Sequence, residues 1–219
     1  MQKIELFSTP LWITSIDPTT YDKEEIIKVV ESNYDKQPIR VVGEHSVSNL
    51  HHYYDDWDNP KFHKPNLDKL CLQYSNIINE FIKTIKFQKS VSYNYNVVNI
   101  TVMKAGQFFD EHDHYDANNL NSPTFSCVHY IKHNNENSPL IFKNPLIFAQ
   151  YVSSRNPHSS FLDSKAVENS SYYYEQTINV REDSFIIFPS YLKHLVRSTD
   201  KTTDSRISIA INIYFKEVK

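Results

Sequence analysis

The chain contains 219 residues, of which 40% are hydrophobic and 22% are charged, and its formal net charge is -3. This composition is typical of a folded globular protein rather than of a disordered chain. The near-neutral charge and the lack of a Lys/Arg-rich run exclude the electrostatic signature of a dedicated duplex-nucleic-acid-binding protein.

No stretch of about 18 apolar residues occurs, so the sequence predicts a soluble protein without a membrane partner. Cys71 and Cys127 are the only cysteines and form no CxxC pattern. This argues against a disulfide framework and against a zinc-thiolate site. Any metal would therefore be held by nitrogen and oxygen ligands.

The first third of the chain predicts two short strands and two helices. The strands fall within residues 3–15, interrupted at Thr9-Pro10, and the first helix covers residues 22–33. The second helix covers residues 66–85, with Asn66 as its N-cap, because apolar residues recur there at spacings of three and four. These residues are Leu67, Leu70, Cys71, Tyr74, Ile77, Ile78, Phe81, Ile82 and Ile85. Such a stripe needs an apolar surface to cover.

From residue 91 onward the hydrophobic period changes to two, which is typical of strands. The predicted strands are 92–105, 123–133, 138–143, 172–180, 183–189, 192–198 and 205–215. A run of strands after helices indicates one antiparallel β-rich domain. Residues 144–171 show the least pattern, which is typical of a functional lid or an insertion.

The last strand, RISIAINIY, has two contrasting faces. Isoleucines at 207, 209, 211 and 213 point one way and can pack beneath the helix of residues 66–85. Arg206, Ser208, Ala210, Asn212 and Tyr214 point the other way. A one-sided antiparallel strand normally exposes such a face to water, whereas the histidine segments described next favour an internal cavity.

Three histidines form a candidate metal site. His112 and His114, in AGQFFDEHDHYDAN, would lie on the same face if this segment is a strand end, so their imidazoles could converge on one ion. FIIFPSYLKHLVRS offers His194, flanked by apolar residues, as the third ligand. Taken singly, an HxH pair can arise by chance and a lone histidine is more often a core residue. Their joint order with Arg206 favours the metal site.

These segments resemble a family of Fe(II)- and 2-oxoglutarate-dependent oxygenases found in phages and marine bacteria. The resemblance rests on GxxFxxHxH at 106–114, FPSYLKH at 188–194, RISIAIN at 206–212 and the opening LFSTPLW at 6–12. It implies a mainly β fold with N-terminal helices, namely a double-stranded β-helix (a cupin-like jelly roll) with the helices packed on the major sheet. It also implies one oxygenase domain, 1–219. Residues 1–90 would supply the N-terminal strands and helices, and 91–219 the jelly-roll core with an insertion at about 144–177.

The resemblance implies iron at the open end of the jelly roll, with 2-oxoglutarate chelating it. His112 and His194 match two iron ligands. Arg206 and Ser208 match the clamp for the distal carboxylate of the cosubstrate, and an Arg side chain suits that role because its planar fork can donate two hydrogen bonds. Tyr130 is a further partner for the same carboxylate.

The second ligand has two assignments, because the wider superfamily uses HxD with a carboxylate ligand. In the first assignment, which we prefer, His114 completes a three-histidine site. In the second, Asp116 restores an HxD pattern with His114, and His112 moves away from the ion. Asp110, Glu111 and Asp113 are expected to be solvated, or to contact the ligands, rather than to bind the metal themselves.

The resemblance further implies hydroxylation of an unactivated C–H bond in a protein, nucleotide or small molecule, with consumption of O2 and release of succinate and CO2. The alternatives are a cupin-like three-histidine metal enzyme without 2-oxoglutarate and a noncatalytic jelly-roll binding protein. Selectivity is expected to reside in loops 44–64 and 144–171, which carry no readable motif. We expect a cytoplasmic protein, in a bacterial host if phage-encoded, and leave open whether it forms a homodimer.

Overall fold

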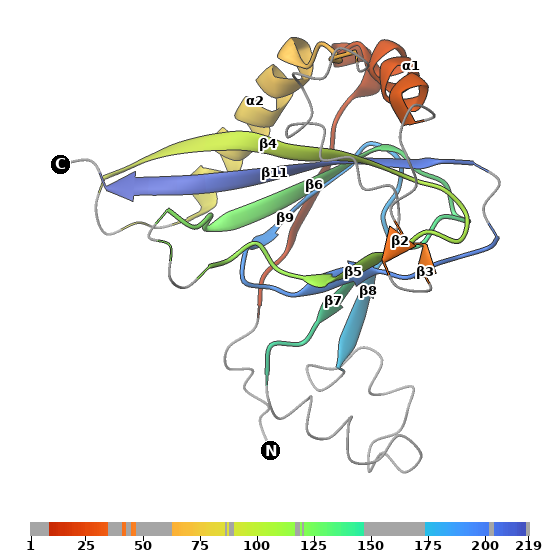
Figure 1. Cartoon of the computed structure of the whole chain (residues 1–219). Coiled ribbons are helices and arrows are strands. Elements are labelled where there is room, and N and C mark those ends of the chain that lie inside the picture. Colours follow the sequence, from red (N-terminus) through yellow and green to blue (C-terminus); the bar gives the residue numbers. More distant parts are fainter. Residues whose placement is uncertain are drawn as a thin grey trace, which may run out of the picture.

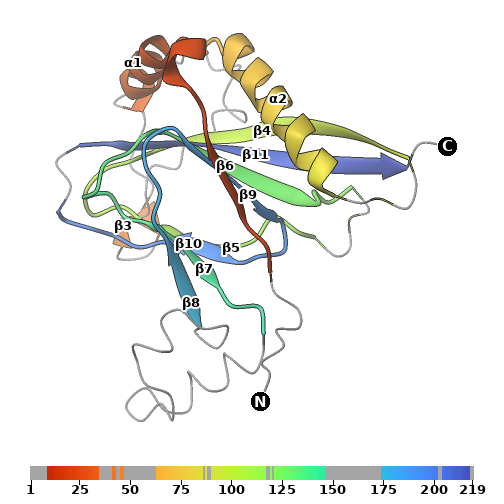
Figure 2. The same cartoon turned by 180° about the vertical axis from the view of Figure 1, so that it is seen from behind.

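Two antiparallel sheets face each other, and two helices cover the outer face of the larger sheet (Figures 1 and 2). The computed structural model describes residues 9–34, 41–42, 45–46, 63–85, 87, 90–116, 119, 121–146, 174–201 and 204–217. Loops 44–64 and 144–171, where we expected selectivity to reside, lie outside these residues except for 45–46, 63–64 and 144–146. The strand expected within residues 3–8 also lies outside them.

The helices are η1 (Pro18–Thr20), α1 (Lys23–Tyr34) and α2 (Asp68–Thr84). The strands are β1 (Trp12–Ser15), β2 (Val41–Val42), β3 (His45–Ser46), β4 (Val91–Met103), β5 (Phe109–His112), β6 (Phe125–Lys132), β7 (Leu140–Lys143), β8 (Glu175–Ile178), β9 (Ser184–Pro189), β10 (His194–Val196) and β11 (Arg206–Glu217). Both predicted helices and the seven strands predicted beyond residue 91 are thus confirmed, several with shorter bounds.

The strand order identifies the architecture. The major sheet runs β1-β9-β6-β11-β4 and the minor sheet runs β5-β10-β7-β8, while β2 and β3 pair only with each other. From β4 to β7 and again from β8 to β11, consecutive strands alternate between the two sheets. This alternation makes a double-stranded β-helix, so the predicted fold class is confirmed.

Helix α2 packs its apolar stripe on the isoleucine face of β11, as predicted. Leu70, Tyr74 and Ile78 are fully buried in the same cluster as Ile209 and Ile211. These contacts remove large apolar side chains from water, and each fully buried one contributes roughly 1.5–3 kcal/mol to stability. The helices therefore stabilise the sheet from one side and leave its other face directed at the minor sheet.

The predicted N-cap of α2 is wrong by one position. The helix begins at Asp68, and Leu67 is the residue at the cap, without a side-chain hydrogen bond. Asn66 still contributes, because its Oδ1 accepts a hydrogen bond of 2.9 Å from the backbone N–H of Asp68. A short polar side chain just before a helix can satisfy a free N–H from more than one position.

A bulge in β4, where it pairs with β11, changes which side chains of β4 point to each face of the sheet. Ala210 pairs with Asn99 but Ile211 pairs with Val97, so Val98 is the extra residue. Asn99 and Val97 would share a face in a regular strand. The bulge instead directs Asn99 toward the minor sheet and Val97 into the core beneath the helices. Bulges often redirect side chains next to functional sites.

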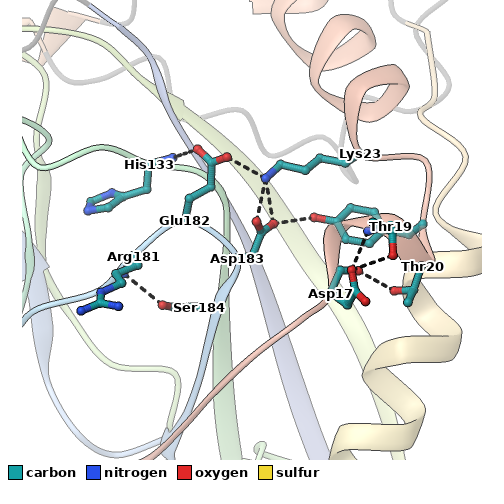
Figure 3. A network of polar contacts seen from close by, with 10 residues as sticks. Asp17, Thr19, Thr20, Lys23, His133, Arg181, Glu182, Asp183 and Ser184 are labelled. Atoms are coloured by element: carbon teal, nitrogen blue, oxygen red, sulfur yellow. Dashed lines mark hydrogen bonds and ion pairs between the residues drawn. The ribbon is translucent and has the colours of Figure 1, made fainter.

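A partly buried ion-pair network connects α1 to the residues just after β6 and just before β9 (Figure 3). Lys23 Nζ lies 2.7 Å from Glu182 Oε1 and 2.8 Å from Asp183 Oδ2. Glu182 also accepts a hydrogen bond of 3.0 Å from the backbone N–H of His133. Burial alone would lower the pKa of Lys23, but the hydrogen bonds to both carboxylates together with their negative charges raise it. Lys23 therefore stays positively charged beside Glu182 and Asp183, which directly precede β9.

Candidate metal centre

His112 and His194 are held opposite each other by strand pairing. His112 is the last residue of β5 and His194 is the first residue of β10, and the two are direct partners in the antiparallel ladder. Direct partners point to the same face of a sheet. The centroids of their imidazole rings lie 4.3 Å apart, on the face of the minor sheet that looks toward the major sheet.

His114 joins them from outside the strand. We expected His112 and His114 to share a strand face, but β5 ends at His112 and His114 lies in a bend. Its ring nevertheless stacks near that of His112, at 5.4 Å between centroids, and lies 5.2 Å from that of His194. The three histidines offer ligand atoms that all lie within 4.8 Å of one another, which makes the trio a candidate site for one metal ion.

Hydrogen bonds select the ring nitrogen that each histidine can offer to a metal. The Nδ1 atoms of His112 and His194 lie 2.8 and 2.9 Å from the backbone oxygens of Asp110 and Leu192. Nδ1 of His114 lies 2.8 Å from Oδ1 of Asn212. A carbonyl oxygen can only accept, so each Nδ1 carries the hydrogen and each Nε2 keeps its lone pair.

Burial keeps the three imidazoles neutral. It lowers the pKa of His194 to about 3, and the neighbouring His112 adds to this effect. Burial also lowers the pKa values of His112 and His114. Neutral imidazole is the form that ligates metals, so protonation, tautomer and position of the trio all fit a divalent cation.

Arg206 faces the same chamber. This chamber, between the two sheets, is lined by the three histidines, by Arg206 and Ser208 from β11, by Asn99 and Thr101 from β4, and by Phe109, Val128, Leu140, Val196 and Ala210. Arg206 is only 4% exposed. Its Nη1 lies 3.1 Å from Sδ of Met103, which is a weak acceptor for a guanidinium.

Tyr130 lies beside Arg206 on the chamber-facing side of the major sheet. It pairs in register with Ser208, and its ring centroid lies 4.9 Å from Cζ of Arg206. Within the part of the chain that the structure describes, the buried Tyr130 Oη and Arg206 Nε have no hydrogen-bond partner. Buried donors without partners are costly, and a ligand carboxylate with several lone pairs would satisfy both.

No acidic residue of the HxH segment belongs to the cluster of candidate ligand atoms. Asp116 is exposed and is not part of the cluster of candidate ligand atoms. Glu111 lies near Lys143 and Lys193, at 3.7 and 3.5 Å. Asp113 accepts a hydrogen bond from the backbone N–H of Tyr115. None of these three carboxylates is therefore among the candidate metal ligands.

Sequence reasoning missed the polar residues behind His114. Ser126, Ser190 and Asn212 form a connected group of hydrogen bonds with its imidazole. Of these, only Asn212 was assigned by the sequence, to the polar face of β11. No spacing in the sequence links Asn212 to His114. Their proximity depends on which strands pair, and this information is not local in the sequence.

The family comparison agrees with the geometry. Residues 98–212, more than half of the chain, match the family model described as "Putative 2OG-Fe(II) oxygenase". The chain therefore belongs to this family, and it is an Fe(II)- and 2-oxoglutarate-dependent oxygenase that uses these two cofactors. No curated protein matches the chain.

Solved structures support the same fold. The non-heme α-ketoglutarate-dependent carbocyclase SnoK from nogalamycin biosynthesis is 11% identical, with a TM-score of 0.58 over 94% of this chain and 79% of that chain. The viral collagen prolyl hydroxylase vCPH from Paramecium bursaria Chlorella virus-1 is 13% identical, with a TM-score of 0.50 over 100% of this chain and 99% of that chain. Their low identities establish the fold and leave the substrate of this chain open.

Proposed function

We propose that His112, His114 and His194 hold the Fe(II) ion through their Nε2 atoms. The observation that carries this proposal is the convergence of three neutral imidazoles from separate segments in one chamber with Arg206. All three Nδ1 atoms are engaged by oxygen atoms, which supports the same assignment. Asp116, the alternative ligand, lies outside this cluster, so we favour the three-histidine site.

We propose that Arg206, Ser208 and Tyr130 bind the distal carboxylate of 2-oxoglutarate. Arg206 brings two donors in a fixed fork, and the two hydroxyl groups lie on the same face beside it. The chamber measures about 40 Å³, and Nη1 of Arg206 contacts the Met103 sulfur, which is a weak acceptor. Binding would therefore exchange the contact with the Met103 sulfur for one with a carboxylate.

The proposed reaction is hydroxylation of an unactivated C–H bond in a protein, nucleotide or small molecule. When bound, the iron together with 2-oxoglutarate and O2 supplies the oxidising power, and succinate and CO2 are released. The histidines would position the metal, while Arg206 would orient the cosubstrate. Apolar side chains from Phe109, Leu140 and Val196 line the chamber and would exclude water from the reacting atoms.

The inward position of Arg206 and Ser208 distinguishes this proposal from the two alternatives. A three-histidine metal enzyme without 2-oxoglutarate has no evident use for a buried guanidinium in its chamber. A noncatalytic jelly roll has no evident use for three converging neutral imidazoles. Family membership also favours the oxygenase.

We further propose that the chain is one oxygenase domain, in which residues 9–34 and 63–85 support the jelly roll formed from residue 91 onward. The shared core beneath the helices supports this, because it draws on both parts. No described helix has both the length and the apolar character needed to span a membrane. Cys71 and Cys127 are unpaired, which supports the proposal of a reducing, cytoplasmic environment.

Conversion of 2-oxoglutarate to succinate tests the assignment without knowledge of the prime substrate. With Fe(II), ascorbate and O2, we expect slow succinate formation by the purified protein. His194→Ala should abolish it, because a two-histidine site loses the metal. Arg206→Ala should raise the 2-oxoglutarate concentration needed for half-maximal rate by more than about 30-fold, since loss of a buried charge partner costs about 2 kcal/mol or more.

His63→Ala and Arg181→Ala serve as matched controls, because both side chains are exposed and lie outside the chamber. Asp116→Ala separates the two ligand assignments and should retain succinate formation. Persistent activity in the His194 variant would refute the metal site. An unchanged 2-oxoglutarate requirement in the Arg206 variant would remove the proposed clamp.

A further inference from the structure

His114 is the one candidate ligand that strand pairing does not hold. His112 and His194 fix each other through the β5–β10 ladder, whereas His114 follows the end of β5. Among the described residues, its backbone N–H donates a hydrogen bond of 2.9 Å to the carbonyl of Ser190. One backbone bond does not fix the ring, and a free imidazole can present either nitrogen to an ion.

A buried polar network holds the ring instead. Nδ1 of His114 lies 2.8 Å from Oδ1 of Asn212 and 2.9 Å from Oγ of Ser126. Oγ of Ser126 also lies 2.9 Å from Oδ1 of Asn212 and 2.8 Å from Oγ of Ser190. Asn212, Ser126 and Ser190 are at most 8% exposed. The network thus joins β6, β11 and the turn after β9 to the imidazole.

The hydroxyl hydrogens set the direction of each bond. Ser126 has one hydroxyl hydrogen and donates it to Oδ1 of Asn212, because an amide oxygen can only accept. Ser190 must then donate to Ser126, because only Ser190 has a hydrogen left for their contact. This arrangement keeps the amide oxygen of Asn212 facing the ring, where it accepts the hydrogen of Nδ1.

We propose that Asn212 is the positioning residue for His114. Oδ1 of Asn212 orients the Nε2 lone pair of His114 toward the ion. This role rests on the proposed three-histidine iron site. Ser126 and Ser190 orient Asn212 in turn. Partners of this kind, which hold the far nitrogen of a ligating histidine, typically change metal affinity by 10- to 100-fold when removed.

Binding of Co(II) tests the inference without requiring turnover. Affinity is measured by competition with a chelator, and the visible d–d absorption of bound Co(II) reports the number and geometry of its ligands. Asn212→Leu removes the acceptor and should weaken Co(II) binding by about 10- to 100-fold, with a changed absorption spectrum. Asn212→Asp keeps an acceptor at the same place and should bind within about threefold of the wild type or more tightly.

Asn96 supplies the matched control. It lies directly opposite Asn212 on β4 and its side chain is exposed. Asn96→Leu and Asn96→Asp repeat the same changes in size and charge at an exposed neighbour outside the hydrogen-bonded group of His114, and both should bind Co(II) as the wild type does. If Asn212→Leu folds poorly, Ser126→Ala tests the same network. It should also weaken Co(II) binding, but by less than Asn212→Leu.

The outcomes separate the inference from the proposed function. Wild-type protein that binds no Co(II) would refute the iron site itself. Tight wild-type binding that persists with an unaltered spectrum in both Asn212→Leu and Ser126→Ala would overturn the positioning role alone. Loss of binding in Asn212→Asp equal to that in Asn212→Leu would show that the amide donates rather than accepts, which also overturns the inference.

Discussion

The two faces of β11 bury side chains of opposite character. On the face toward the helices, Ile207, Ile209, Ile211 and Ile213 are completely buried among apolar side chains. On the face toward the minor sheet, the polar residues Arg206, Ser208 and Asn212 are also nearly inaccessible, at 4%, 7% and 8% exposure.

This difference shows that a strand face made of polar residues need not be exposed to water. An antiparallel strand with one apolar face commonly leaves the other in water, and β11 departs from that expectation because a second sheet covers it. Burying a guanidinium, a hydroxyl and an amide costs free energy unless partners are provided. The face toward the helices contributes stability. On the chamber-facing side, the proposed partner of Arg206 and Ser208 is 2-oxoglutarate, and the partner of Asn212 is His114.

The largest expected effect comes from the helix-facing side. Ile209→Ala should lower the free energy of unfolding by about 2–5 kcal/mol, because it removes buried methyl groups and leaves a cavity. Its side chain points away from the chamber, so Co(II) affinity of the folded protein should stay unchanged. Urea denaturation and Co(II) titration measure the two quantities. A loss of metal affinity without a loss of stability would contradict the separation of the two faces.

The next effect concerns pH and His129, which lies on the same side. Nδ1 of His129 lies 2.9 Å from the Tyr74 hydroxyl, and burial lowers the pKa of His129 to about 3. Between about pH 6.5 and 3 the unfolded chain therefore binds a proton that the folded chain does not. Stability should fall as the pH falls through this window, by at most about 1.4 kcal/mol per pH unit for this residue.

His129→Gln removes this titration and should flatten the dependence of unfolding free energy on pH. The comparison uses the slopes of the two proteins between about pH 7 and 5, in chelator, so that the three metal-site histidines contribute equally to both. Equal slopes would show that His129 does not titrate on unfolding in this window.

The smallest effect is expected on the chamber-facing side. Ser208→Ala should weaken 2-oxoglutarate binding about fivefold, corresponding to about 1 kcal/mol for one hydrogen bond, and should leave Co(II) affinity unchanged. Isothermal titration of the Mn(II)-loaded protein under nitrogen measures the first quantity. Ser208 and Ile209 are neighbours in β11 and point to opposite faces. Comparing Ser208→Ala with Ile209→Ala therefore compares the two faces at one place along the strand.

Much of the fold followed from local patterns. The period of three to four over residues 66–85 and the alternation of RISIAINIY predicted α2, β11 and their contact, because a repeat that matches a secondary structure can be read from neighbouring residues alone. His112, His114 and His194 were singled out by their order with Arg206 and by a family resemblance that residues 98–212 now support. Their roles as ligands remain a proposal with a defined test.

The tertiary structure alone decided which of these patterns face each other. It ended β5 at His112, inserted Val98 as the extra residue in β4, and enclosed the polar face of β11 with a second sheet. It also brought Asn212 to His114. Each of these outcomes depends on register between strands far apart in the chain, and a shift of one residue reverses every side chain, so no local stretch of sequence contains the answer.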